Sequence, residues 1–199
     1  MTPDLPWPLV DTALRDELVA RWSTGRGYHD LTHLAEILDH LVALGAGEDR
    51  ELLLAAWFHD AVYDDAPDPE ERSAELAERL LPPAGVDPAG VAEVARLVRL
   101  TAHHRPDPGD RRGMLLVDAD LAILAAGRPR YATYVAGVRA EYAAVSDADF
   151  ARGRADVLRG LLAKPTLFHT AEARARWEEA ARANLARELV GLDRAAERA

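Results

Sequence analysis

The apolar residues of this chain recur with a helical period along almost its whole length. No window alternates apolar and polar residues for long enough to indicate a half-buried strand. Turn sequences such as GAGEDR, DDAPDPE, PPAGVDPAG and HRPDPGDRRG divide the pattern into segments. We therefore predict an all-α fold with helices near residues 11–22, 31–44, 50–63, 70–81, 88–104, 113–126, 130–145, 148–163 and 171–191.

The size of the chain favours one packed core. A chain of 199 residues, 49% of them hydrophobic and 29% charged, can fill one core and is short for two. No internal repeat and no long linker divides it. We predict a single helical-bundle domain over residues 1–199, with a core at about 22–126 and the C-terminal helices of 130–191 packed on it.

The charge distribution limits the class of partner. The formal net charge is −10, and no run rich in lysine or arginine is present that could neutralise a series of phosphates. We therefore expect no nucleic-acid polymer and no membrane surface as a main partner. The N-terminal sequence lacks a basic region followed by an apolar one, so we expect a cytoplasmic protein. Trp7 and Trp177, expected on the surface, leave a homo-oligomer open.

The pair His59-Asp60 stands inside the apolar run LLLAAWFHDAVY. A charge in such a run needs a partner, and a divalent cation is a simple one. The chain has no cysteine, so nitrogen and oxygen atoms must hold any metal ion. On a helix, His59 and Asp60 would point about 100° apart, yet both can reach one ion if the helix passes it side-on.

Further histidines and carboxylates can complete such a site. His29 and His33 are four positions apart, so a helix that begins by Asp30 places them one turn apart on nearly the same side. The segment MLLVDADLAIL carries Asp118 and Asp120, which point about 200° apart on a helix. One of these two aspartates is expected to complete the site, and the other to have a structural role.

Several of these residues also have ordinary structural explanations. His103 and His104 close the helix VAEVARLVRLTAHH, where a histidine commonly compensates the helix dipole. His40 and His169 lack a nearby carboxylate pattern and are interpreted as ordinary core or surface residues. In the acidic loop DDAPDPEER, Glu71 lies in the first turn of the next helix. The group as a whole, and no single residue, therefore indicates a site.

The ordered set His33, His59-Asp60 and Asp120 resembles the HD superfamily of metal-dependent phosphohydrolases. The segments YHDLTHLAEIL, AAWFHDAVYD, EERSAELA, DADLAIL and VRAEYAAV are together similar to its small bacterial branch, from about Trp22 to Leu189. The opening YHxxxH also resembles the start of the catalytic domain of cyclic-nucleotide phosphodiesterases. The resemblance implies a helical HD-type fold with all these residues on helices.

The resemblance also implies a role for each residue. His33, His59, Asp60 and Asp120 would hold a divalent metal ion, namely Mn, Fe, Co, Ni, Zn or Mg, with Asp60 bridging if two ions bind. His29 or His104 would protonate the leaving oxygen. His103 or His104 would contact the substrate or a second ion. Asp118 and Glu71 would contact the metal ligands and orient them. Arginine forks suit phosphate, and the candidates are Arg72, ranked first, and Arg139, Arg152 and Arg154.

The expected activity is hydrolysis of a phosphate ester by metal-activated water. The expected substrate is a small phosphorylated molecule, with nucleotides as one class. Two alternatives stay open: an HD-type di-iron oxygenase, and a non-catalytic metal-binding or ligand-binding regulatory domain.

Overall fold

The protein is helical throughout the part that the structure describes. The computed structural model describes residues 5–64 and 67–196, which form nine α-helices and one short 3₁₀-helix and contain no strand. The prediction of an all-α chain is thereby confirmed. The chain divides into two compact units, Met1–Asp120 and Leu121–Ala199, which are described separately below. The single domain over residues 1–199 stays a prediction.

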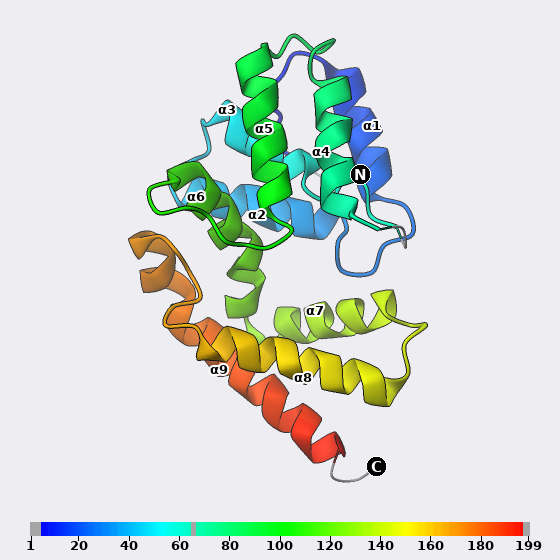
Figure 1. Cartoon of the computed structure of the whole chain (residues 1–199), viewed down its shortest axis with the longest axis vertical. Coiled ribbons are helices and arrows are strands. Elements are labelled where there is room, and N and C mark those ends of the chain that lie inside the picture. The colour runs from blue at the N-terminus through cyan, green and yellow to red at the C-terminus, as the bar shows by residue number, and fades with distance from the viewer. Residues whose placement is uncertain (1–4, 65–66, 197–199) are drawn as a thin grey trace. The chain divides into compact units, whose positions relative to one another are not determined.

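The first unit consists of the helices up to α6. Aspartates at the N-caps of four of them accept hydrogen bonds from backbone amides of the first turn, and proline at the first position opens α4 and α5. The helices, drawn in blue to green in Figure 1, are α1 Thr12–Trp22, α2 Leu31–Ala43, α3 Arg50–Phe58, α4 Pro69–Leu80, α5 Pro88–Leu100 and α6 Arg111–Leu121.

Helix α3 forms the centre of the first unit. Its residues from Leu52 to Phe58 are all buried, and it contacts α2, α4 and α5. Trp22 at the end of α1 and Trp57 in α3 are both fully buried, and the Trp22 indole donates a hydrogen bond of 3.0 Å to the Trp57 carbonyl. The apolar run in the sequence therefore forms the core helix, and His59 and Asp60 directly follow its C-terminal end.

The prediction that residues 50–63 form one helix is wrong at its C-terminal end. Helix α3 ends at Phe58, His59 is its C-cap, and Asp60 lies in the turn that follows. The His59 ring explains the break, because its Nδ1 lies 2.8 Å from the Ala56 carbonyl that a continuing helix would use for the Asp60 amide. His59 and Asp60 therefore reach the site from a helix end and a turn, not from the side of a helix.

The prediction that a helix reaches His104 is also wrong. Helix α5 ends at Leu100, and the Thr101 hydroxyl donates to the Val98 carbonyl at 2.7 Å. His104 has a left-handed backbone with φ 52°, a conformation that histidine adopts more readily than most residues. Pro106 and Pro108 follow and cannot continue a helix. His103 and His104 thus lie in a turn.

The second unit contains η1 Ala122–Ala125, α7 Arg128–Glu141, α8 Asp147–Ala163 and α9 Ala171–Ala196. The predicted helix at 113–126 is thus two elements, α7 stops short of the predicted 145, and α9 extends beyond 191. Helix α9 contacts η1 and α8, which lies beside it in Figure 1. The buried Asn184 amide on α9 donates to the carbonyls of Leu124 and Ala126 at 2.9 and 2.8 Å, which fixes η1 to α9.

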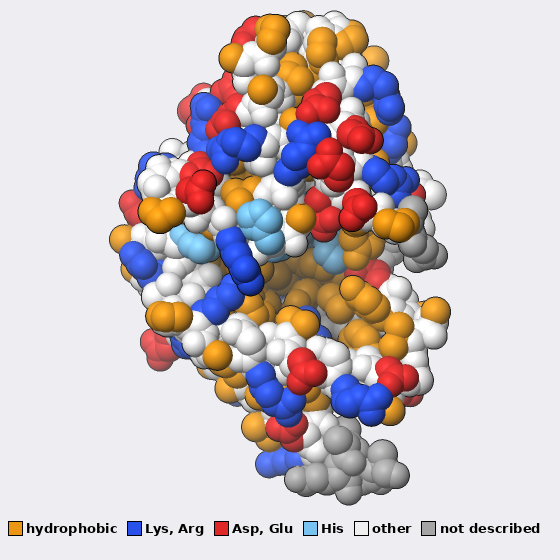
Figure 2. Space-filling view, in the orientation of Figure 1, with side chains coloured by type: hydrophobic (Ala, Val, Ile, Leu, Met, Phe, Trp, Pro, Cys, Tyr) orange, Lys and Arg blue, Asp and Glu red, His pale blue; other side chains and the backbone are white. Residues whose placement is uncertain are grey.

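The surface carries many paired charges. Figure 2 shows acidic and basic side chains interleaved over α4 and α5, where Arg99 binds the carboxylates of Glu71 and Glu78. Trp7 and Trp177 are half-buried instead of exposed, because Trp7 packs on Trp57 and Trp177 packs on Phe168. No helix among the described residues has the length and the apolar composition that a membrane span requires.

Candidate metal centre

His33 enters the centre from the first turn of α2. The N-cap Asp30 accepts hydrogen bonds from the amides of Thr32 and His33, at 2.8 and 3.2 Å, and so fixes this turn. The His33 Nδ1 atom lies 2.7 Å from the Tyr28 hydroxyl. With its proton on Nδ1, His33 donates to that hydroxyl and keeps Nε2 as a lone pair for a ligand.

His59 enters the centre from the end of α3. The Ala56 carbonyl near its Nδ1 can only accept a hydrogen bond, so Nδ1 carries a proton and Nε2 offers a lone pair in the neutral ring. The Trp22 ring lies 5.3 Å from the imidazole, centroid to centroid. Backbone and core packing therefore fix both the tautomer and the orientation of His59.

Two carboxylates face these imidazole nitrogens. The His59 Nε2 atom lies 3.2 Å from Asp60 Oδ2, and the His33 Nε2 atom lies 3.2 Å from Asp120 Oδ1. A third separation, from His59 Nε2 to Asp120 Oδ1, is 4.0 Å. The two carboxylate side chains are 13% and 14% exposed, so they are largely withdrawn from water. The four side chains thus come together from α2, from the C-terminal end of α3 and from α6.

The two separations of 3.2 Å fit ligand atoms that share a metal ion, and the third, of 4.0 Å, is longer. Two ligand atoms at about 2.1 Å from one ion lie about 3.0–3.4 Å apart when their bonds form angles of about 90–109°. Both Nε2 atoms are buried, and within the described residues neither makes a hydrogen bond of acceptable direction, although a carboxylate oxygen lies at hydrogen-bond distance from each. Buried polar atoms without a partner are rare and need an explanation, and an ion between nitrogen and oxygen atoms supplies one.

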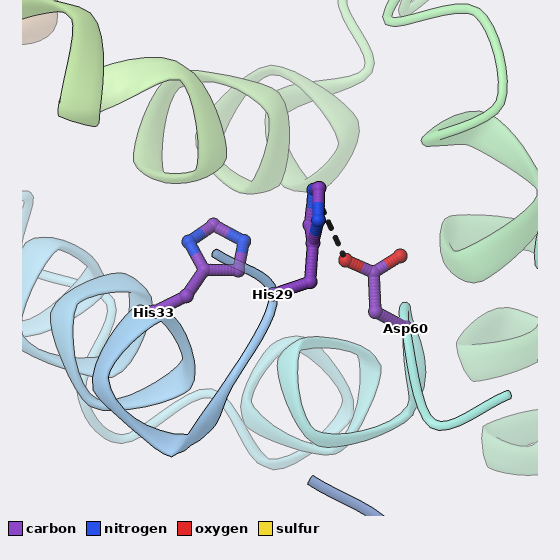
Figure 3. Close-up of side chains that lie close together, drawn as sticks. All are labelled: His29, His33 and Asp60. Carbon is purple, nitrogen blue, oxygen red and sulfur yellow. Dashed lines mark ion pairs between the residues drawn. The ribbon is translucent and has the colours of Figure 1, made fainter. Parts of the chain in front are cut away.

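His29 forms a second group with His33 and Asp60. One ligand atom from each of these three residues lies within 4.8 Å of the others, as is also true of His33, His59 and Asp120. His29 Nε2 lies 3.9 Å from Asp60 Oδ2, along the dashed line in Figure 3. The His29 ring lies 4.4 Å from the ring of Tyr63. The structure brings His29 and His33 close together, but His29 precedes the N-cap Asp30 and does not lie on α2, so the two histidines are not one helical turn apart as expected.

His104 contacts the outer oxygen of Asp120. Its Nε2 donates to Asp120 Oδ2 at 2.7 Å, while Oδ1 of the same carboxylate faces His33 and His59. The left-handed backbone at His104 aims the ring at this oxygen, and non-glycine residues in that conformation cluster at functional sites. His104 is therefore placed to orient Asp120, to donate a proton or to hold a second ion.

The charges of the centre are strongly coupled. Burial alone would lower the pKa of His59, but attraction to the Asp60 carboxylate outweighs it and raises that pKa to about 9. Burial opposes ionisation of Asp60 and Asp120, yet the neighbouring histidines hold the pKa of both carboxyls below the usual range. Burial lowers the pKa of His33 despite the nearby Asp120. The centre thus combines two carboxylates with a largely neutral His33.

Four residues predicted for the site belong to neither group of possible ligands, and three of them make other polar contacts. Glu71 is exposed and pairs with Arg99, so the structure does not bring it to the ligands. Arg72 forms an exposed fork with Asp64, at 2.5 and 2.8 Å. His103 is exposed and its Nδ1 accepts from the Arg105 amide. Asp118 is fully buried and belongs to neither group of possible ligands.

The remaining arginine candidates belong to the second unit and have carboxylate partners there. Arg139 binds Asp147, Arg152 binds Asp149, and Arg154 binds Glu188. In the first unit, His40 contacts the Ala119 carbonyl at 3.2 Å, in keeping with its interpretation as an ordinary residue.

Sequence reasoning missed the residues that hold the centre in place. Trp22 packs on His59, Tyr28 contacts His33, and Arg26 donates to the carbonyls of His29 and Asp60. The only signal in the sequence was the proximity of Arg26 and Tyr28 to His29 in RGYHDLTH. No spacing rule connects them to the HD pair, because the contacts form only in the folded chain.

Comparison with known proteins adds no family to this description. No protein-family model matches the chain, and neither the curated proteins nor the solved structures contain a match to it.

Proposed function

We propose that this protein is a metal-dependent phosphohydrolase of the HD superfamily that hydrolyses a small phosphate ester. One observation carries the proposal: the unpaired Nε2 atoms of His33 and His59 lie together with the carboxylates of Asp60 and Asp120. These residues occur in the order that the HD resemblance requires. Nitrogen and carboxylate ligands suit Mn, Fe, Co, Ni or Zn, and Mg is a further candidate.

The proposed ligands are His33, His59, Asp60 and Asp120. A bound divalent ion would supply Lewis acidity and would lower the pKa of a water molecule toward neutrality. The protein would hold the ligands in place through the Ala56 carbonyl behind His59 and the Tyr28 hydroxyl behind His33. Asp60 faces both His59 and His29, so it would be the ligand shared by two ions if two bind.

Two histidines are proposed as proton donors to the leaving oxygen. His29 is a quarter exposed and lies beside Asp60, so it can meet both the centre and a substrate from solvent. His104 is 31% exposed and already donates to Asp120. A proton donor placed at the leaving oxygen typically contributes about 10²–10⁴-fold to the rate. Arg72 remains the proposed phosphate contact, and it must open its fork with Asp64 to act.

A turnover screen with metal reconstitution tests the proposal. We would treat the chelator-washed protein with each candidate ion and measure hydrolysis of p-nitrophenyl phosphate, bis(p-nitrophenyl) phosphate and a nucleotide panel. We expect ion-dependent hydrolysis that is lost in Asp60→Asn and kept in Asp30→Asn. Asp30→Asn is a matched control because asparagine replaces aspartate well as an N-cap.

Other results would favour the alternatives. Tightly bound iron with oxygen-dependent turnover and no hydrolysis would favour a di-iron oxygenase. A bound ion with neither hydrolysis nor oxygen consumption would favour a non-catalytic binding domain. Either result would contradict the proposed phosphohydrolase.

A further inference from the structure

Arg26 joins the two segments that carry His29 and Asp60. Its Nη1 donates to the His29 carbonyl and its Nη2 donates to the Asp60 carbonyl, each at 2.8 Å, and the second bond spans 34 positions of the chain. Its Nε donates to the Arg21 carbonyl at 2.9 Å. One guanidinium therefore connects the end of α1, the approach to α2 and the turn after α3.

The positions of these carbonyls explain why an arginine is needed. His29 precedes the N-cap of α2, and Asp60 follows the C-cap of α3, so neither residue is held within a helix. Carbonyls at helix C-termini lack an intrahelical partner and carry partial negative charge, which a cation stabilises. Arg21 and Asp60 lie at two such ends. A planar fork with five N–H groups can satisfy carbonyls in several directions, whereas the single ammonium of lysine cannot.

Aromatic rings fix the plane of the guanidinium. The Arg26 Cζ atom lies 4.8 Å from the centroid of the Trp22 ring and 5.5 Å from that of Tyr63. The Trp22 ring also packs on His59, and the Tyr63 ring packs on His29. Both of these rings thus also contact a histidine of the candidate centre.

We propose that Arg26 is a positioning residue of the candidate metal centre, which sets the placement of His29 and Asp60 through their backbone carbonyls. It acts through these residues, because three of its N–H groups donate to backbone carbonyls. The inference deepens the proposed function and rests on it for the identity of the ligand. The positions of the two segments can be tested without any metal.

The test compares Arg26→Lys and Arg26→Ala with Arg21→Ala. Arg21 is a matched control because, within the described residues, its exposed guanidinium binds only Glu17, four positions back on α1. The Arg21→Ala variant also keeps the Arg21 carbonyl that accepts from Arg26. In metal-free protein, hydrogen exchange should accelerate at residues 29–33 and 59–64 in both Arg26 variants. The Zn²⁺ and Mn²⁺ dissociation constants, measured against a chelating dye, should rise about 10–100-fold, as for other contacts that orient ligands. Arg21→Ala should match the wild type.

The possible outcomes separate the two proposals. Wild-type exchange and wild-type metal affinity in folded Arg26→Lys would overturn the positioning role. Hydrogen exchange that accelerates evenly over α1–α6 would also overturn the positioning role, because this pattern would indicate a general loss of stability. If Arg26→Ala does not fold, the hydrogen exchange and metal affinity of Arg26→Lys and Tyr63→Leu test the positioning role by the same criteria. If the wild type binds neither ion, the proposed function fails, and the exchange pattern alone decides the role of Arg26.

Discussion

Each unit contains a largely buried polar cluster with at least one carboxylate, but the carboxylates have different partners in the two clusters. In the second unit, Glu188 accepts from Arg154 at 2.7 Å and from the Tyr131 hydroxyl at 2.5 Å, and Arg154 also donates to the Tyr134 hydroxyl. In the first unit, Asp60 and Asp120 face histidines, and two of the imidazole nitrogens that face them make no hydrogen bond within the described residues.

The difference indicates two roles for buried charge. A guanidinium is always charged and binds a carboxylate through a fork, so the Arg154–Glu188 pair leaves little capacity for a ligand. Imidazole can be neutral and can coordinate an ion, so the cluster of the first unit is open to one. We therefore interpret the Glu188 cluster as part of the fold and the Asp60 cluster as a functional centre.

Asp60→Asn should give the largest functional effect. The change removes a proposed ligand charge while keeping the side chain's shape, so we expect loss of the bound ion and of all ion-dependent hydrolysis. Circular dichroism should show retained helix content. Elemental analysis and the turnover screen check the two losses, with Asp30→Asn as the control. Unchanged ion content in Asp60→Asn would remove this residue from the centre.

Glu188→Ala should damage the fold and spare the centre. It leaves the largely buried Arg154 charge unpaired, and such changes typically cost about 3–5 kcal/mol. Urea unfolding would measure the loss, and the metal content of the folded fraction should equal that of the wild type. The double variant Arg154→Met/Glu188→Leu should recover most of the stability. A stability change below about 1 kcal/mol in Glu188→Ala would contradict the assigned structural role.

The neighbouring histidines His103 and His104 offer a matched pair. Replacing His104 by alanine removes the hydrogen bond to Asp120, so the metal dissociation constant should rise about 10–100-fold. Replacing the exposed His103 should change this dissociation constant by less than about 2-fold, since His103 accepts a local hydrogen bond from the Arg105 amide. Titration against a chelating dye measures both. Equal effects from the two variants would count against the geometry described for His104.

The coupled charges predict a pH dependence of the metal-free protein. The folded-state pKa of His59 is raised from 6.5 to about 9, so the stabilisation from its protonated form is complete below pH 6.5 and is lost as the pH rises to 9. The free energy of unfolding in urea should therefore fall across this interval. His59→Gln should lack that dependence. Metal binding should release protons in the same interval, and calorimetry in buffers of different ionisation enthalpy would detect them.

Arg72→Ala should have the smallest effect. The side chain is exposed and pairs with Asp64, so metal affinity and helix content should match the wild type. If Arg72 contacts the phosphate, KM should rise while kcat stays the same, because the contact would bind substrate and transition state equally. Steady-state kinetics separates the two constants. An unchanged KM would remove Arg72 from the proposed substrate site.

The sequence predicts helix centres better than helix ends. The periodicity places every α-helix of the described residues, because apolar residues at helical spacing must face a core. The ends of α3 and α5 involve single side chains: the His59 ring contacts the Ala56 carbonyl, and the Thr101 hydroxyl donates to the Val98 carbonyl. Neither effect has a spacing signature that a periodicity analysis detects.

The candidate ligands could be anticipated, but their supports could not. His33, His59, Asp60 and Asp120 carry chemistry that a pattern can single out, and the structure brings them together. Arg26 donates to the Asp60 carbonyl, which lies 34 positions along the chain, and no spacing rule in the sequence predicts that contact. Glu71 shows the opposite failure, because its place in a resembling segment did not reveal that it pairs with Arg99 on the surface.

Elemental analysis of protein purified without chelator tests the central claim most directly. The wild type would be compared with the double variant His59→Ala/Asp60→Ala, after circular dichroism confirms that both are folded. The account predicts near-stoichiometric Mn, Fe, Co, Ni or Zn, as one or two ions per chain, that is absent from the variant. Equal trace metal in both folded proteins, unchanged after metals are supplied, would contradict it and would make the HD pair a structural feature.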